Sequence, residues 1–259
     1  RSRGAVMSSE ISSVVFSLSL FLGLLLSLVI GRRIGMRRVA KDPEGARAGV
    51  AAVEGAVFAL MGLLIAFTFS GAAARFDARR NLIIEEANAI GTAWLRLDLL
   101  SATAQPAIRQ EFRDYLDARL ATYRNFPDQS ATRAELAKSA RLQREIWNRT
   151  VTATHESGMQ QATMLLLPAL NEMFDIATTR VMATGMHPPV IIFAMLFGLS
   201  LIAELFAGFA MVGGRSPSWL HVIGFATVMA ISVYVILDLE YPRRGLIQVD
   251  TFDQALVDL

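Results

Sequence analysis

One run of polar side chains stands out in this sequence, because its spacing is helical and it follows directly after an apolar stretch. Steps of four, three, four and four residues separate Asn81, Glu85, Asn88, Thr92 and Arg96, so the five share one face of an α-helix. Two of them are amides and one is a hydroxyl, whereas a solvated helix face more often carries Lys and Glu. Such groups suit a water-filled vestibule or a hydrogen-bond network between subunits.

The opposite face of this segment is apolar and carries Ile83, Ala87, Ile90, Trp94 and Leu97. The alternative interpretation is therefore an amphipathic helix whose polar side only meets solvent. The neighbouring carboxylates Glu85 and Glu86 diverge by about 100° on a helix, which makes them a poor pair for acid–base catalysis.

A single acidic residue, Glu204, lies near the middle of an apolar stretch at residues 190–212. A charge at the centre of a membrane helix costs about 3 kcal/mol, so such groups usually face a helix bundle or water. Ser200 and Gly208 lie four residues away on the same face, and Thr227 is a possible partner from a neighbouring stretch. One interpretation is a protonated carboxyl that bonds within the bundle, and the other is a site for proton-coupled transport.

Nothing in the sequence matches a catalytic or metal-binding motif. There is no phosphate-binding glycine loop, no dinucleotide fingerprint, no nucleophile elbow and no zinc-protease motif. The chain has no cysteine, and His155, His187 and His221 lie far apart without ligand spacing. The basic residues are spread along the chain rather than clustered for nucleic acid. We expect no enzyme activity, no cofactor, no metal site and no nucleic-acid partner.

Four nearly uncharged apolar stretches, at residues 11–30, 50–74, 190–212 and 219–237, are each long enough to cross a bilayer. The first is too long for a signal peptide core and ends in GRRIGMRR rather than a small-residue cleavage site. We therefore predict an all-α membrane protein, with four transmembrane helices and a helical soluble module between the second and third.

The predicted division of the chain follows these stretches. Residues 8–49 form the first transmembrane helix and a basic loop, and residues 50–74 form the second, a candidate pore helix. Residues 75–186 form the soluble module, residues 187–240 the third and fourth transmembrane helices, and residues 241–259 a short, extended C-terminal tail.

The soluble module is predicted to contain three helices, because Ala, Leu, Arg and Glu dominate it without strand-like alternation. The first continues from the membrane to about Arg124, where Asn125-Phe126-Pro127-Asp128 ends it. The second runs from about Ser130 to Glu156 and ends at Ser157-Gly158. The third runs from about Met159 to Thr184, with a kink at Pro168.

The second apolar stretch carries small residues that allow helix backbones to approach closely: Gly55, Ala59, Gly62, Ala66 and Ala73. In a symmetric oligomer, a ring of Ile65 or Phe69 would form a hydrophobic constriction that gates by dewetting. The alternative is that these side chains face lipid or a neighbouring helix.

Three segments resemble bacterial membrane proteins of the bestrophin-like domain family. They are GLLIAFTFSGAAARFDARRNLIIEEANAIGTAWLRLDLL, then LLLPALNEMFDIATTRVMA followed by HPP, and finally DLEYPRRG. The resemblance covers nearly the whole chain from the first apolar stretch onward. It implies kinship to the bestrophins, pentameric ion channels whose subunits have four membrane helices. In them the second helix lines a pore with a hydrophobic neck, and a helical soluble region continues the conduit.

The sequence leaves the orientation in the membrane open. Cationic residues are more frequent in the loop after the first stretch than on the opposite side, which predicts that the soluble module faces outward. The resemblance implies instead that the module is cytoplasmic. The predicted location is the bacterial inner membrane.

These patterns predict an oligomeric ion channel, a pentamer by resemblance, whose partners are the bilayer, further copies of itself and ions. Ile65 and Phe69 would form the neck, and the face from Asn81 to Arg96 would line a vestibule. Rings of Glu85 would favour cations, whereas rings of Asn or Arg96 would tolerate anions. The alternative function is a non-conducting scaffold or sensor whose soluble helices bind a partner.

Overall fold

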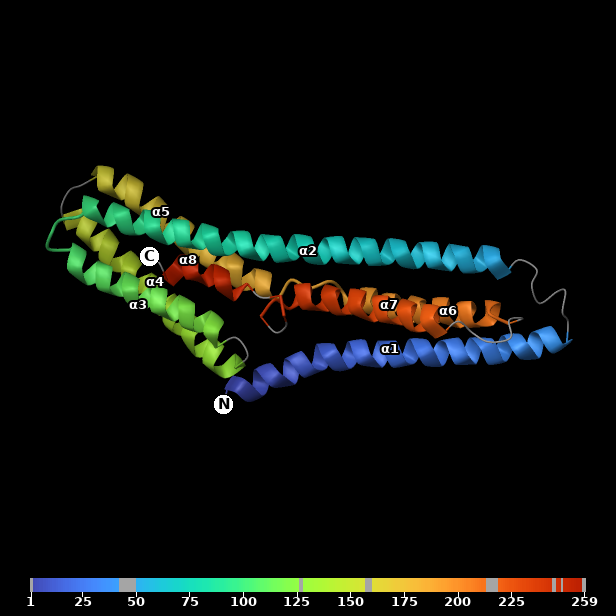
Figure 1. The fold of residues 1–259 in the computed structure, drawn as a ribbon. Helices are drawn as coiled ribbons and strands as arrows, with labels where there is room; N and C mark the ends of the chain where they lie inside the picture. Colours follow the sequence, from blue (N-terminus) through green and yellow to red (C-terminus); the bar gives the residue numbers. More distant parts are fainter. Residues whose placement is uncertain are drawn as a thin grey trace. The chain divides into compact units, whose positions relative to one another are not determined.

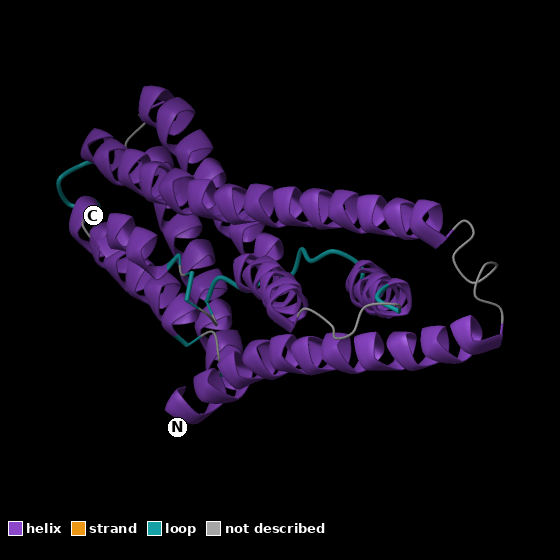
Figure 2. Ribbon diagram, turned by 45° about the vertical axis from the view of Figure 1, so that its right-hand side comes forward, coloured by secondary structure: helices purple, strands orange, loops and turns teal. Residues whose placement is uncertain are grey.

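The chain is helical throughout the part that the computed structural model describes (Figures 1 and 2). That part comprises residues 2–41, 50–125, 128–156, 160–212, 219–243, 246–247 and 249–257, and no strand forms within it. The elements in chain order are α1 Ser2–Lys41, α2 Val50–Arg96, η1 Leu97–Leu99, α3 Gln105–Arg124, α4 Gln129–Glu156, α5 Gln160–Thr184, α6 Val190–Ala210, α7 Trp219–Glu240, η2 Asp250–Asp253 and α8 Gln254–Val257. The predicted all-α class is confirmed.

The chain divides into two compact units. The span unit comprises Ser9–Arg75 and His187–Leu246, and the module unit comprises Arg1–Ser8, Phe76–Met186 and Ile247–Leu259. Helix α2 contributes its first part to the span unit and its second part to the module unit. Each unit is described separately below.

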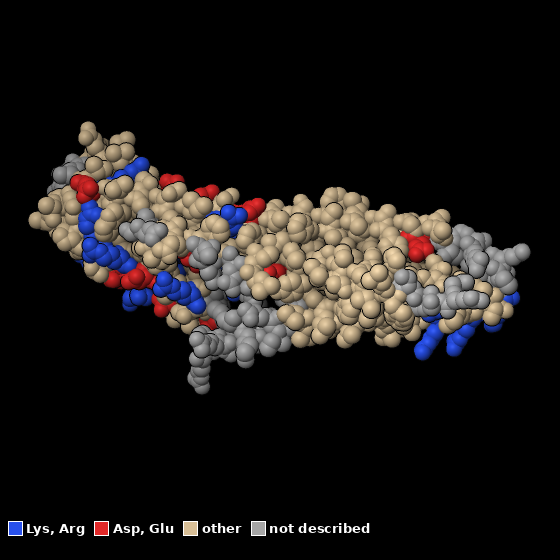
Figure 3. All heavy atoms as spheres, in the orientation of Figure 1, with Lys and Arg blue, Asp and Glu red and all other residues tan. Residues whose placement is uncertain are grey.

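Four helices in the described ranges are long and apolar enough to cross a membrane: Val14–Lys41, Ala51–Leu99, Val190–Ala210 and Trp219–Glu240. The four predicted spans are therefore confirmed as helices of sufficient length. On the face drawn in Figure 3, few charged side chains appear over these helices, and many more gather over the module helices.

Within the span unit, α1 and α6 run parallel in close contact, as the first and third spans of an alternating topology must. The rings of Phe16 and Phe197 lie 5.3 Å apart, and further along, Gly31 packs on Leu205. A Cβ on Gly31 would collide with the Leu205 carbonyl oxygen, and a Cβ on Gly208 would collide with that of Leu28. Glycine therefore permits this backbone approach.

Within the module unit, the second part of α2 packs with α3, α4, α5 and α8 around one apolar core. The predicted buried face of α2 is confirmed, since Ile83, Ala87, Ile90 and Leu97 are all buried. Asp128 starts α4, because its Oδ1 accepts the backbone N–H of Ser130 at 2.9 Å and that of Ala131 at 3.1 Å. The Ser130 hydroxyl and these N–H groups lower the pKa of Asp128.

The first module helix is shorter than predicted. It was expected to continue to about Arg124, but α2 ends at Arg96, a single 3₁₀ turn follows, and α3 begins at Gln105. Pro106 lies in the first turn of α3, where its missing N–H costs nothing. Helix α5 contains Pro168 and continues through it as a single helix. The predicted breaks at Phe126-Pro127 and Ser157-Gly158 lie outside the described residues.

The C-terminal segment, residues 249–257, is not the extended tail that was predicted. It forms η2 and α8, and it belongs to the module unit. Leu256 is fully buried in the module core, and the Arg80 guanidinium lies 4.3 Å from the Phe252 ring. An apolar side chain with a place in the core gains more from docking than from solvation.

Replacing Leu256 with alanine should therefore destabilise the module by about 2–5 kcal/mol, the usual cost of a cavity left by a buried leucine. Val257 is the matched control, because it is the next residue and its side chain is exposed. Thermal unfolding followed by circular dichroism should show a lower midpoint for Leu256→Ala than for Val257→Ala. Equal midpoints would contradict this packing.

Candidate functional site

The polar face predicted on α2 exists in the module unit, and most of it is open to solvent. Asn81, Glu85 and Asn88 are exposed, and Thr92 and Arg96 are half-buried. The Arg96 guanidinium is also engaged, because it donates to the backbone oxygen of Leu165 at 2.6 Å. The structure thus brings the predicted vestibule residues together on one face, with Arg96 held towards α5 at its end.

Most other charges on this part of α2 have partners. The Arg80 guanidinium donates to Asp77 at 3.1 Å. Arg79 is buried and donates to the backbone oxygens of Ala183 at 3.2 Å and Met186 at 2.9 Å. Among the described residues, Glu85 has neither a hydrogen bond nor an ion pair. It is the free charge on the exposed face.

Glu86, the neighbour of Glu85, points into the module instead and is fully buried. Its carboxylate accepts from Arg119 Nε at 2.5 Å and from Arg180 Nη1 at 2.6 Å. Arg180 also donates to Asp253 of the C-terminal segment at 2.5 Å. One buried carboxylate therefore connects α2 with α3, and through Arg180 with α5 and η2.

Tyr123 completes this cluster. Its hydroxyl accepts from Arg119 Nη2 at 2.8 Å, and the Arg180 guanidinium lies 3.7 Å from the centre of its ring. Burial is the largest single influence and lowers the pKa of Arg119, but Glu86, Tyr123 and Tyr115 together outweigh it, so that pKa is raised. Burial also raises the pKa of nearby Tyr115 to about 12, so its hydroxyl stays neutral.

Sequence reasoning missed this buried cluster, although a signal was present. Glu86 lies between Ile83 and Ile90 on the apolar face of α2, and an acid in that place must find a cation once the face is buried. Arg180 likewise follows Ala177 at helical spacing on the buried face of α5. Interrupted apolar faces on different helices predict such a cluster, but not which residues pair.

In the span unit, α2 has one packed side and one open side. Met61, Thr68 and Ala72 are buried, whereas Leu60, Leu63 and Phe67 are exposed, Phe67 at 68%. Of the two predicted neck residues, Phe69 is 45% exposed and Ile65 is half-buried beside the packed side. Around Gly55 and Gly62 the space is open, so this chain's own close helix contact is made by α1 and α6, not by the small residues of α2.

A charged cluster in the span unit connects the middle of α2 with the end of α7 and with the loop before α6. The Arg75 Nε donates to both oxygens of the buried Glu240 carboxylate, at 3.1 and 3.0 Å. The His187 Nδ1 lies 3.0 Å from Glu240 Oε1, and the rings of His187 and Tyr241 lie 4.6 Å apart. At this end of α7, Glu240 thus pairs with Arg75, while Asp238 accepts the backbone N–H of Leu246 at 3.1 Å.

Glu204 is buried in α6, with Ser200 and Gly208 buried on either side, as the spacing predicted. Its proposed partner is wrong, because Thr227 is exposed on α7. The Ser200 hydroxyl donates to its own helix, to the Leu196 oxygen at 2.6 Å. Among the described residues, Glu204 Oε2 has no hydrogen-bond partner. This carboxyl is thus buried within the span unit.

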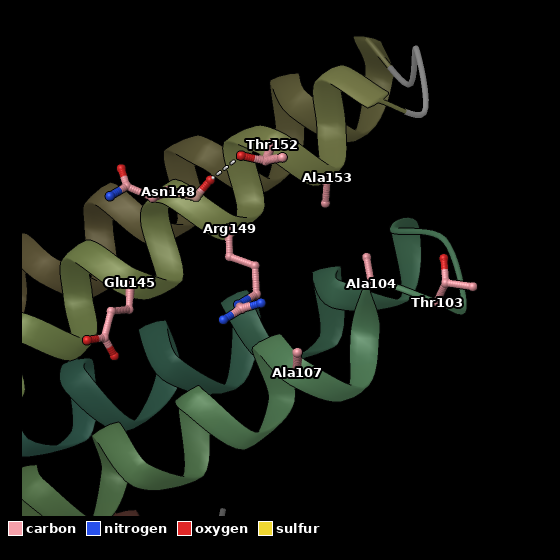
Figure 4. A pocket seen from close by; sticks show the side chains of 8 residues that line it. All are labelled: Thr103, Ala104, Ala107, Glu145, Asn148, Arg149, Thr152 and Ala153. Atoms are coloured by element: carbon pink, nitrogen blue, oxygen red, sulfur yellow. Dashed lines mark hydrogen bonds between the residues drawn. The ribbon is translucent and has the colours of Figure 1, made fainter.

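The module also has an open hollow of about 520 Å³ beside the start of α3 (Figure 4). It is lined from α4 by Glu145, Asn148, Arg149 and Thr152, among others. Arg149 is paired with Glu111 at 2.8 Å, so the hollow offers no free cation for an anionic ligand. In the ranges that the structure describes, no group of acidic and histidine side chains is arranged to hold a metal ion.

Residues 18–252 match the family model described as Bestrophin-like domain. A solved structure of a bacterial bestrophin homologue from Klebsiella pneumoniae, in a point-mutant form, superimposes with a TM-score of 0.69 at 17% identity. It covers 93% of this chain and 98% of its own.

A second structure of the Klebsiella pneumoniae homologue gives a TM-score of 0.66 at 17% identity, over 92% of this chain and 97% of its own. A third structure, of a point-mutant membrane protein, gives 0.63 at 18% identity, over 93% and 98%. No curated protein matches the chain. At these identities the superpositions show a shared fold.

Proposed function

This chain belongs to the bestrophin-like domain family, and we propose that it is an oligomeric ion channel whose pore is lined by the exposed face of α2. The observation that carries the proposal is the character of that face. It is apolar where α2 crosses the membrane and polar where α2 enters the module, as a hydrophobic gate followed by a wet vestibule requires.

Helix geometry selects which membrane residues share a face with the vestibule. Phe67 precedes Glu85 by 18 residues, which is about five turns of an α-helix, so the two side chains point the same way. Leu63 lies one turn before Phe67 on this side. Phe69 lies about 160° around the helix from Glu85. We therefore propose that Phe67 and Leu63 form the neck, in place of Ile65 and Phe69.

The channel requires several copies, and the family resemblance suggests five. In a single chain Leu60, Leu63 and Phe67 on the exposed face of α2 are each more than half exposed. Copies arranged around a common axis would bring these side chains together and narrow the path between them. The proposed location is the inner membrane. The family resemblance supports a cytoplasmic module. Because the module includes the segment after α7, we propose that this C-terminal segment is cytoplasmic as well.

Phe67 and Phe69 make a matched pair for testing the neck. Replacing Phe67 with alanine should raise the single-channel conductance of protein in planar bilayers severalfold, because a wider and less hydrophobic constriction wets more easily. The same change at Phe69 should leave the conductance near the wild-type value. A larger effect at Phe69 than at Phe67 would restore the neck predicted from the sequence.

The alternative function is a non-conducting scaffold or sensor that uses the polar face to bind a partner. Subunit number separates the two functions before any electrical recording. The channel requires a ring of subunits in mild detergent, which mass measurement of the intact complex detects. A monomer or dimer that passes no current would favour the scaffold and contradict the channel.

A further inference from the structure

We propose that Glu85 makes the conduit of this channel prefer cations, and this inference rests on the proposed function. The sequence alone left the sign of selectivity open, because both Glu85 and Arg96 share the polar face. The positions and partners of the charged side chains on α2 show which of these two residues can act on ions.

The arginines on this part of α2 either bond to other groups of the protein or are buried away from the polar face. Arg96 donates to the Leu165 oxygen of α5, and Arg80 pairs with Asp77 and lies over Phe252. Arg79 is buried against the chain that precedes α6. None of these guanidiniums extends freely from the face that carries Asn81 and Asn88.

Glu85 differs from them in both exposure and partners. It is exposed, and it has no ion pair or hydrogen bond within the described residues, so its carboxylate is open to water and to passing ions. Asn81 lies one turn before it and Asn88 one turn after, both exposed and both neutral. The exposed face therefore carries one negative charge per chain at this level.

Arg96 is also too distant to cancel that charge. Eleven residues of α-helix separate it from Glu85, which is about 16 Å along the axis. The Debye length is about 8 Å at physiological ionic strength, so the two charges act on ions at different levels of the conduit. A ring of carboxylates attracts cations and repels anions as they pass.

The test is the reversal potential of reconstituted channels under a potassium chloride gradient. In wild-type channels the reversal potential should lie closer to the equilibrium potential of potassium than to that of chloride. In Glu85→Gln the cation-to-anion permeability ratio should fall severalfold towards one, and in Glu85→Lys it should cross below one. Glu172→Gln removes another exposed carboxylate, on α5, and is the control, with no expected change. Because Glu85 has no partner, its variants should unfold at the wild-type temperature.

The possible failures point to different conclusions. Channels that conduct but prefer anions, or whose reversal potential does not move in Glu85→Gln, overturn this inference and leave the channel in place. An equal shift in Glu172→Gln also overturns it, because the effect would then come from surface charge in general. Protein that passes no current overturns the proposed function, and this inference with it.

Discussion

Replacing Glu86 with glutamine should destabilise the soluble module by about 3–5 kcal/mol, the usual cost of removing one partner from a buried ion pair. The amide keeps the shape of the side chain but removes its charge. Arg119 and Arg180, both nearly fully buried, would then face each other without their shared carboxylate. Asp253 would remain as a partner for Arg180 alone. The expected loss of stability is a large part of the free energy of unfolding of a typical domain.

The adjacent residue supplies the control. Glu85→Gln is the same chemical change one position along the same helix, at an exposed carboxylate without a partner. It should alter the stability by no more than about 0.5 kcal/mol. Chemical denaturation of both variants in detergent, followed by circular dichroism, measures the difference. If the two variants unfold together, the buried cluster does not stabilise the module.

Replacing Gly31 with alanine should disrupt the packing of the spans. The new methyl group would overlap the Leu205 carbonyl oxygen, and backbone atoms cannot rotate away as a side-chain end can. Overpacking of this kind costs about 1–3 kcal/mol or more, because α1 and α6 must separate. Gly208→Ala should act in the same way, since its methyl group would overlap the Leu28 oxygen.

Gly62→Ala is the matched control within a span. No atom of the described residues lies within 4 Å of a Cβ at this position. Alanine is the better helix former by about 1 kcal/mol, so this variant should unfold at or above the wild-type temperature. The three glycine variants are compared by thermal unfolding in detergent, and size-exclusion chromatography measures how much of each protein is folded. A stable Gly31→Ala protein would show that α1 and α6 do not cross at this point.

The sequence predicted the features that depend on one helix at a time. The four spans follow from length and hydropathy, and the buried and exposed faces of α2 follow from a period of 3.6 residues. Glu85 and Glu86 show where prediction from a single helix ends. Their divergence was predicted, but the burial of Glu86 depends on Arg119 and Arg180, whose approach no local pattern encodes.

The errors share that physical origin. Gly31 and Gly208 make a close contact that no prediction named, because it arises where their helices cross, and the position of a crossing is a tertiary property. Thr227 was placed near Glu204 by depth alone, although depth does not determine which way a side chain points. The C-terminal segment has too few apolar residues to be identified as structured until Leu256 has a core to enter.

The contact between Arg180 and Asp253 has a consequence for biosynthesis. During translation the helices up to α5 are made before α6 and α7 enter the membrane, whereas residues 250–257 are made after both. The segment that supplies Asp253 and Leu256 can therefore reach its place only after the last two long helices have been made. Until then Arg180 lacks one of its two carboxylates, and the core lacks one of its leucines. The core of the module is thus complete only when synthesis of the chain is nearly finished, although most of its helices are made much earlier.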